Sequence, residues 1–360
     1  MSKVGNFFIM CGKGIIIAFR YLKKKQLLVP LLLLVVLLII NVIINSNNFG
    51  SRIIDILNDA SEVAILAIGM TFVTSACGGQ DISVGAGIAI VSALVMKLGA
   101  ENQLGINLIV VFLICITISV ALSAFNGVLV SYFKILPMVA TLILFRAGRD
   151  IAYLIGGPSI TAPDNSAIKI FGSFIPGTVL PMPILITIVC VAIIVLVLRF
   201  SNLGLYTQSV GINAKAARLN GIKPERVKML SFIILGVCVC IAGFVNIGRN
   251  ASITSYDGIT SGIELDVILA VAIGGTILGG GKFNLAGSLI GAYTIQLLTS
   301  TLLRIPGSTT STIVFYKAIF VIVLIVLGSP VIREKLSLLF AKLKYSFKTS
   351  EKNEIKKEGA

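Results

Sequence analysis

The stretch LLVPLLLLVVLLIINVII, residues 27–44, contains no charged side chain and is long enough to cross the hydrocarbon core of a bilayer. A cleaved signal peptide would have a shorter apolar core, followed by a small-x-small cleavage site. The sequence NVIINSNNFGSR, residues 41–52, offers no such site. We therefore expect residues 27–44 to be an uncleaved transmembrane helix.

The composition extends this interpretation to most of the chain. Of the 360 residues, 56% are hydrophobic and only 12% are charged, and the mean hydropathy is +1.02. A soluble domain carries about 25% charged residues. The chain has no His, and its six Cys include no Cys-x-x-Cys pair, so we interpret the cysteines as small apolar residues. We expect no catalytic site, no metal site and no cofactor.

Further apolar runs complete an all-α, polytopic membrane bundle of about ten transmembrane spans. The nine additional spans are expected at about 61–77, 82–97, 104–125, 138–157, 182–200, 230–248, 265–281, 285–303 and 313–328. An even number of spans places both termini on one side. The predicted organisation is a basic segment 1–26, a membrane domain 27–328 and a basic tail 329–360, with loops 158–181 and 249–264 on the opposite side.

The net charge of +15 follows this topology. Most Lys and Arg residues fall in three segments: before the first span, within 201–229, and after the last span. Clusters of Lys and Arg beside membrane spans mark the cytoplasmic side. Both termini and the loop 201–229 are therefore expected in the cytoplasm, and the charge does not indicate a nucleic-acid partner.

The spans are of two kinds. The first, fourth, sixth and tenth are rich in Leu, Ile and Val, whereas the second, third, eighth and ninth are rich in Gly, Ala, Ser and Thr. Small residues let helix backbones approach closely in lipid, and Gly275/Gly279 and Gly287/Gly291 have the spacing typical of such contacts. We expect these four spans to form an inner bundle that the apolar ones shield.

A faint internal repeat links two of the inner regions. CGGQDISVGAGIAIVSAL, residues 77–94, and LGGGKFNLAGSLIGAYTI, residues 278–295, each follow an apolar run and each start with a Gly-Gly break. Glycine-interrupted helices at matching places in two halves indicate a translocation path, although chance similarity between Gly-rich helices is an alternative. The candidate path residues are Asp81, Ser83, Gly85, Asn126, Arg149, Gly279 and Asn284.

Charged residues inside spans are costly and need a partner, a wet cavity or an interfacial position. Asp81 either caps the helix that follows it or contacts a substrate; capping is favoured. Arg146 and Asp150 are spaced i,i+4 and are expected to pair. Lys317 is expected to extend towards the membrane surface.

The segment GINAKAARLNGIKPERVKML, residues 211–230, resembles part of a soluble protein. Asn213 is suited to an N-cap, Gly221 to a left-handed C-cap and Pro224 to a first helical turn. The expected structure is a short helix, a tight corner and the start of the seventh span. A solvated loop would need the basic residues but not two capped helices with an alanine face, so we favour a docking role.

Four segments resemble one family. Ala216-Ala217-x-x-x-Gly221 is similar to the core of the cytoplasmic coupling loop of ABC importer permeases. Residues 78–90, 136–157 and 274–292 resemble segments of the ribose/galactose/xylose-type permeases, and 136–157 is nearest to galactofuranose-type members. The resemblance covers roughly residues 27–328, in the family's order.

The resemblance implies a permease subunit in the bacterial cytoplasmic membrane that imports a monosaccharide. Its implied partners are a separate ATP-binding protein, an extracytoplasmic sugar-binding protein, and a second permease subunit, identical or paralogous. The implied coupling residues are Ala214, Lys215, Ala216, Ala217, Arg218, Gly221, Pro224 and Arg226. The chain is not expected to be an enzyme: the run nearest to a P-loop, TILGGGKF, has Thr276 and Phe283 where Gly and Ser or Thr are needed.

Two kinds of alternative remain open at this stage. Within the permease family, the substrate could be a nucleoside or a sugar-derived signal molecule. Outside it, an ion-coupled secondary transporter would also have about ten spans and glycine-broken helices. Such a transporter would usually carry membrane carboxylates for its ion, and Asp81 is the one unpaired candidate.

Overall fold

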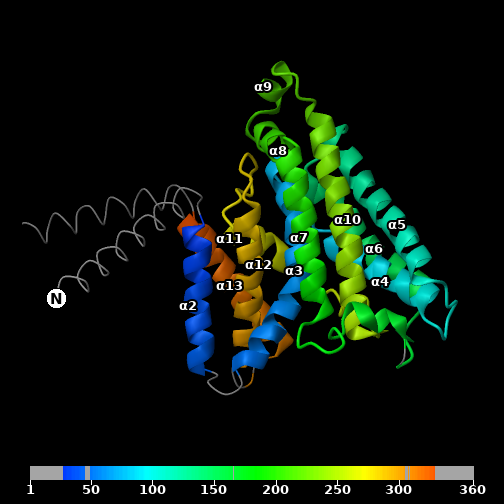
Figure 1. Cartoon of the computed structure of the whole chain (residues 1–360). Coiled ribbons are helices and arrows are strands. Elements are labelled where there is room, and N and C mark those ends of the chain that lie inside the picture. The colour runs from blue at the N-terminus through cyan, green and yellow to red at the C-terminus, as the bar shows by residue number, and fades with distance from the viewer. Residues whose placement is uncertain (1–26, 45–48, 165, 305–306, 308, 329–360) are drawn as a thin grey trace, which may run out of the picture. The chain divides into compact units, whose positions relative to one another are not determined.

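The computed structural model describes residues 27–44, 49–164, 166–304, 307 and 309–328, so the predicted basic segments 1–26 and 329–360 lie outside the described residues. The described chain is mostly helical, which confirms the predicted helical membrane protein at this level (Figure 1). The helices are α2 (Leu28–Ile44), α3 (Phe49–Cys77), α4 (Val84–Gly99), α5 (Leu108–Ser131), α6 (Pro137–Gly156), η1 (Ala167–Phe171), α7 (Met182–Phe200), α8 (Leu203–Ile212), α9 (Ala214–Leu219), α10 (Pro224–Asn250), α11 (Ile263–Ile273), α12 (Leu285–Leu302) and α13 (Thr310–Gly328).

Each of the ten predicted spans contains a helix. Within the described residues, five segments are long and apolar enough to cross a membrane: Arg52–Cys77, Leu108–Ser131, Met182–Phe200, Pro224–Asn250 and Leu285–Leu302. The number of crossings therefore stays a prediction. The chain divides into two compact units, Met1–Arg304 and Ile305–Ala360. Helix α13 belongs to the second unit, and the sites described below all lie in the first.

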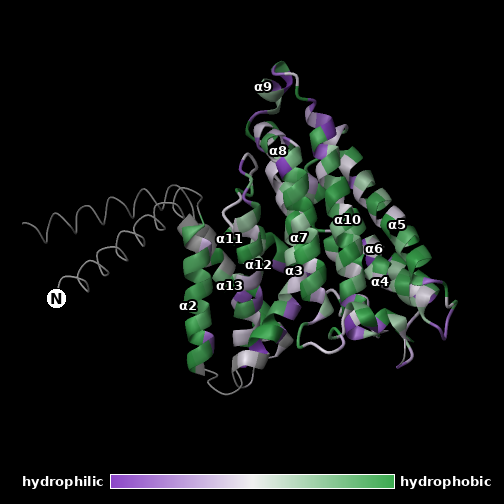
Figure 2. Cartoon of the chain, viewed as in Figure 1, coloured by the Kyte–Doolittle hydropathy of each residue, from purple (hydrophilic) through white to green (hydrophobic). Residues whose placement is uncertain are grey.

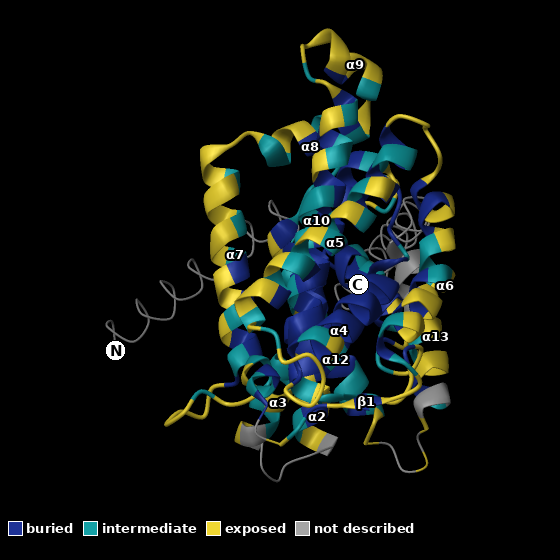
Figure 3. Ribbon diagram, turned by 90° about the vertical axis from the view of Figure 1, so that its right-hand side faces the viewer, coloured by how far each residue is buried: buried dark blue, intermediate teal, exposed yellow. Residues whose placement is uncertain are grey.

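The inner and outer helices separate largely as their compositions predict. The apolar segment of α3 is 94% buried and α4 is buried along almost its whole length, whereas only 22% of the apolar segment of α5 and 17% of that of α7 are buried (Figure 3). Figure 2 shows that these exposed helices are hydrophobic along their length, as lipid-facing helices are.

Helix α10 is also central, which its apolar composition did not indicate. It packs against α3, α4 and α5, and it buries large side chains, including Phe232, Leu235 and Phe244. Glycines allow part of this approach: a Cβ at Gly243 would lie 2.5 Å from Val91 Cγ1.

The predicted span 265–281 is wrong at its C-terminal end. Helix α11 stops at Ile273, and residues 274–284 form an irregular loop. Gly275, Gly280 and Gly281 have φ angles of +81°, +89° and +81°, a backbone conformation that ends a helix and that glycine adopts readily. With 11 residues, α11 is about 16 Å long, roughly half the thickness of a hydrocarbon core.

The two long loops predicted on one side of the membrane pair with each other. Strand β1 (Ile160–Thr161) runs antiparallel to β2 (Ser252–Ile253), with Ile160 opposite Ile253. The predicted outside segment 249–264 is not simply a solvated loop, because Tyr256, Thr260 and Glu264 are buried. Both loops therefore lie at the same end of the first unit, opposite to α9 (Figure 1).

The contact between α11 and α12 gives a first test. A Cβ at Gly291 would overlap the backbone carbonyl oxygen of Ala270, so Gly291→Ala must push the two helices apart. We expect a loss of about 1–3 kcal/mol, the usual cost of overpacking, measured as a lower apparent melting temperature in detergent. Gly50→Ala is the matched control, since no atom lies within 4 Å of a Cβ at Gly50. Equal melting temperatures for the two variants would contradict this packing.

Candidate functional site

The two glycine breaks predicted from the repeat lie against each other. The first break follows α3 and the second follows α11. Gln80 Nε2 donates a hydrogen bond to the Leu278 carbonyl at 3.0 Å, and the Gly281 N–H donates to the Ser75 carbonyl at 3.0 Å. A Cβ at Gly78 would lie 2.7 Å from the Gly279 oxygen, so the contact is between backbones. The candidate path residue Gly279 is thus placed directly at the first break.

Three other candidate path residues form one buried cluster at the first break. Asp81 Oδ1 accepts hydrogen bonds from the backbone N–H and the hydroxyl of Ser83, at 2.7 and 2.6 Å. Asn126 Nδ2, from α5, donates to Ser83 Oγ at 3.0 Å. Asp81 therefore fixes the turn before α4 through Ser83; the N-cap of α4 is Ser83 and no side chain caps this helix, so the favoured capping by Asp81 is wrong. Asn126 Oδ1 is buried without a partner among the described residues and could accept a hydrogen bond from a ligand hydroxyl.

Asn284 braces the second break. Its side-chain amide donates to the Gly274 carbonyl at 2.8 Å, and its oxygen accepts from the Gly287 N–H at 3.2 Å. It therefore caps α12 and ties the end of α11 to the beginning of α12. Gly287 and Gly291 lie on α12 against α11 as their spacing predicts, whereas Gly275 and Gly279 lie in the loop and not on a helix.

The predicted hairpin has the expected local conformation. Asn213 Oδ1 accepts hydrogen bonds from the N–H groups of Lys215 and Ala216, both at 3.0 Å. Gly221 has φ +80°, and Pro224 occupies the first turn of α10. The predicted N-cap, C-cap and helix start are confirmed. The additional helix α8, which precedes α9, was not predicted.

One face of the hairpin differs from the expectation. Ala217 points inward and packs with Ala76, Val210 and Val227, so it is not part of a docking face. Ala216 and Lys215 are exposed, and Leu219 is 90% exposed. The helix is too short for its apolar face to be read from sequence periodicity. The exposure of Leu219, at the end of α9, was not predicted from the sequence.

The end of α8 is wedged against both glycine breaks. A Cβ at Gly211 would overlap the Ser75 carbonyl and would lie 2.5 Å from the Gly281 nitrogen. A Cβ at Gly281 would in turn lie 2.9 Å from Ile212 Cγ1. Three chain segments meet here, backbone against backbone, and the hairpin follows directly after Gly211. The contact of Gly211 with Ser75 and Gly281 is therefore made by backbone atoms, without a flexible side chain in between.

A buried ion pair lies near the start of α4. Arg149 Nη2, from α6, lies 2.5 Å from Glu264 Oε1 in the first turn of α11, and both side chains are buried. Arg149 Nη1 also donates to the Phe145 carbonyl at 2.9 Å. A Cβ at Gly85 would overlap the Glu264 carboxylate, so this glycine makes room for the pair. The predicted pair of Arg146 and Asp150 is present, at 4.0 Å, but both side chains are exposed.

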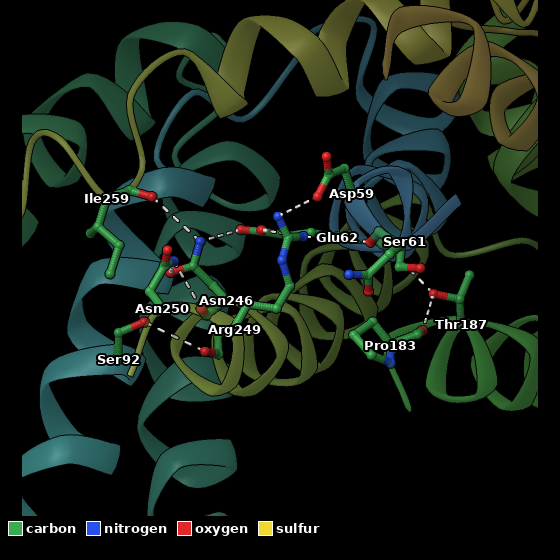
Figure 4. Close-up of polar contacts among 12 residues, drawn as sticks. Asp59, Ser61, Glu62, Ser92, Pro183, Thr187, Asn246, Arg249, Asn250 and Ile259 are labelled. Atoms are coloured by element: carbon green, nitrogen blue, oxygen red, sulfur yellow. Dashed lines mark hydrogen bonds and ion pairs between the residues drawn. The ribbon is translucent and has the colours of Figure 1, made fainter. Parts of the chain in front are cut away.

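A second, partly buried network joins α3 to α10. Arg249 Nη2 lies 2.8 Å from Asp59 Oδ1, and its Nη1 lies 3.8 Å from Glu62 Oε2. Asn246 Nδ2 donates to the other Glu62 oxygen at 2.9 Å (Figure 4). Both helices carry these side chains near the end opposite to α9. The network fixes the position of α10 beside α3, and its polar groups are satisfied inside an apolar bundle.

Sequence reasoning missed the acidic partners of these networks. Glu264, Asp59 and Glu62 lie at the ends of apolar runs, where charges are ordinarily assigned to loops. A usable signal was present: Arg149 is an intramembrane cation, and such a residue requires a carboxylate from another segment. The segment that supplies it could not be identified, because α6 and α11 are far apart in sequence.

Comparison with known proteins gives consistent matches. The family described as "Branched-chain amino acid transport system / permease component" matches residues 52–327. The galactofuranose transporter permease protein of Escherichia coli is 40% identical over 73% of this chain and 75% of its own length. The fructose import permease protein of Bifidobacterium longum is 34% identical over 79% and 80%, and the ribose import permease protein of Bacillus subtilis is 33% identical over 69% and 77%. No solved structure matches.

The ion pair between Arg149 and Glu264 gives a second test. Glu264→Gln leaves a buried guanidinium whose remaining acid, Asp257, is 3.4 Å away and exposed. Removing one partner of a buried pair costs about 3–5 kcal/mol, so the apparent melting temperature should fall clearly. Asp164→Asn removes an exposed pair with Lys169 and should change stability by about 0–1 kcal/mol. A Glu264→Gln protein as stable as the wild type would show that the pair does not hold α6 to α11.

Proposed function

We propose that this chain, which belongs to the family of permease components described for branched-chain amino acid transport systems, is the membrane subunit of an ATP-driven monosaccharide importer. The relatives named above support a sugar, since they are named for galactofuranose, fructose and ribose. The polar cluster of Ser83 and Asn126 is consistent with a neutral substrate, because it offers hydrogen-bonding groups and Asn126 Oδ1 lacks a partner among the described residues. Weak, distributed contacts suit a path that must release its substrate.

The topology and the partners follow from this proposal. We place α9 in the cytoplasm and the paired loops containing β1 and β2 outside, with ten spans and both termini cytoplasmic, in a bacterial cytoplasmic membrane. A separate ATP-binding subunit docks on the α9 side. A sugar-binding protein docks on the side of β1 and β2, and a second permease subunit, identical or paralogous, completes the path. The basic surface around α9 supports this orientation.

The observation that carries the proposed mechanism is the wedge at Gly211. When the ATP-binding subunit closes, it moves α9, and α8 moves with it. Because Gly211 contacts Ser75 and Gly281, this motion changes the contact between the two breaks. The candidate path residues beside the breaks, Asp81, Ser83, Asn126 and Gly279, are then exposed to one side or the other. Asn284 keeps α11 and α12 moving together.

The exposed tip of α9 tests the docking step. Leu219→Asp should abolish copurification of an ATP-binding subunit and reduce ATP-dependent sugar uptake by at least tenfold, with an unchanged melting temperature, because Leu219 makes almost no contact within the chain. Ala217→Asp should instead lower the melting temperature, because it places a carboxylate among Ala76, Val210 and Val227. If no ATP-binding subunit copurifies with the wild-type chain, and uptake persists after ATP depletion, the importer assignment is wrong.

The wedge itself tests the coupling step. Gly211→Val should leave the ATP-binding subunit bound but separate ATP hydrolysis from uptake, because the added side chain overlaps backbone atoms of both breaks. The measurement is the ratio of sugar transported to ATP hydrolysed in proteoliposomes, which we expect to fall at least tenfold. Gly204→Ala is the control on the same helix, since a Cβ at Gly204 meets only side-chain atoms of Leu198 and Phe283, at 3.1 Å or more. An unchanged ratio in Gly211→Val would exclude this route.

A further inference from the structure

A basic cavity lies beside the hairpin, between the end of α5 and the beginning of α10. Its volume is about 420 Å³, and it is lined by Ser131, Tyr132, Lys134, Arg218, Lys223, Glu225 and Arg226. Two lining residues, Arg218 and Arg226, are also among the implied coupling residues, whereas Ser131, Tyr132 and Lys134, at the end of α5, have no role in the coupling mechanism.

The cavity carries more positive charge than the chain neutralises. Arg218 pairs with Glu225, the single carboxylate among the lining residues. Lys134, Lys223 and Arg226 have no ion-pair partner in the described part of the chain. Three cations that converge on one concave site repel each other until an anion binds between them.

Two further kinds of donor group beside the cavity, a hydroxyl and backbone N–H groups, lack a hydrogen-bond acceptor in the part of the chain that the structure describes. Ser131 is 4% exposed, and its hydroxyl has no hydrogen-bond partner among the described residues. Helix α10 has 27 residues and no side-chain cap. The backbone N–H groups of Glu225 and Arg226, in its first turn, therefore have no side-chain acceptor within the described chain. A buried hydroxyl without a partner is uncommon, and a helix N-terminus favours an anion with several acceptor oxygens.

The backbone at Lys134 has an unusual conformation. Its φ is +58°, in the left-handed region, which non-glycine residues seldom adopt and which costs of order 1 kcal/mol. This conformation is part of a tight connection between α5 and α6, and it places the lysine in the cavity wall. A glycine would adopt the same turn without strain but would leave the wall without this charge.

The surroundings indicate where the anion comes from. Tyr132, Phe133 and Leu136 follow α5 directly and are 57%, 69% and 70% exposed. On α5 itself, Ile109, Val110, Leu113 and Phe125 are exposed and apolar. Aromatic residues next to basic ones, at the end of a lipid-facing helix, are typical of the membrane interface. The cavity therefore opens where lipid headgroups lie.

We propose that this cavity binds the phosphate group of an anionic phospholipid. Arg226 and Lys134 pair with phosphate oxygens, the Ser131 hydroxyl donates to one of them, and the acyl chains lie along the exposed face of α5. A bound lipid bridges the α5–α6 connection and the start of α10. The anionic lipid content of the membrane thereby stabilises the hairpin region.

The test measures lipid retention by the full chain in detergent. Native mass spectrometry with added dioleoylphosphatidylglycerol or dioleoylphosphatidylcholine should show one phosphatidylglycerol retained in preference to phosphatidylcholine. Arg226→Gln should weaken this retention by about fivefold, the effect of one cation at a membrane surface. Arg199→Gln is the matched control, because Arg199 is an exposed arginine at the same end of the bundle, on α7, and outside the cavity. Equal retention by Arg226→Gln and Arg199→Gln would overturn the proposal.

A second variant and a competing ligand test the same proposal independently. Lys134→Gly removes a cation while relieving the left-handed strain, so it should weaken lipid retention by about fivefold without lowering stability. Glycerol 3-phosphate supplies the same phosphate without acyl chains and should displace the lipid only weakly. If it displaces phosphatidylglycerol at equimolar concentration, the cavity belongs to a soluble phosphate ester and the lipid assignment is wrong. No preference for phosphatidylglycerol over phosphatidylcholine would likewise contradict the proposal.

Discussion

The contact between the two glycine breaks is the constraint on which the rest of the first unit depends. Main-chain atoms of residues 75–80 lie against those of residues 278–281, and the Gly281 N–H is satisfied by the Ser75 carbonyl. Interrupting a helix in an apolar environment frees backbone groups that must find new partners. Here residues of each break supply hydrogen-bond partners for backbone groups of the other break, so the two breaks depend on each other. The small side chains of α3, α4, α11 and α12 follow from the close approach that this contact requires.

The buried polar residues complete the same requirement. Asp81 satisfies the Ser83 N–H before α4, Asn284 satisfies the start of α12, and Thr141 Oγ1, from α6, accepts from the Ile82 N–H at 3.2 Å. The charged network around Arg149 lies between the start of α4 and residues 257–264, and it fixes α6 to α11. The network around Arg249 lies in the last turn of α10, directly before β2, and it fixes α10 to α3. Polar groups in this bundle therefore serve two purposes. Those at the breaks replace lost helical hydrogen bonds, and those near the paired loops hold helices in register.

How much of this could be predicted from the sequence differs from feature to feature. Signals that are local in the chain were reliable: Asn213, Gly221 and Pro224 determine the hairpin through their own backbone preferences, and the glycine pairs marked both breaks. Features that depend on distant segments were not accessible. The partner of Arg149, the inward orientation of Ala217 and the central position of α10 are each decided by packing between segments far apart in the chain. The end of α11 was misplaced because residues 274–281 are apolar enough to continue a span, and their backbone conformation outweighs their hydropathy.

The hairpin is held at two separate places. Ala217 packs α9 against Ala76 at the end of α3 and Val210 on α8, and Arg218 pairs with Glu225 on α10. The contact with the breaks is made by Gly211, in the last turn of α8, and Asn213 alone separates α8 from α9. In the proposed mechanism, a force applied at the exposed tip of α9 acts on a helix that these contacts hold in place and not on a flexible loop. Rigidity is needed for coupling, because a loop that could absorb the displacement in its own dihedral angles would leave the glycine breaks where they were.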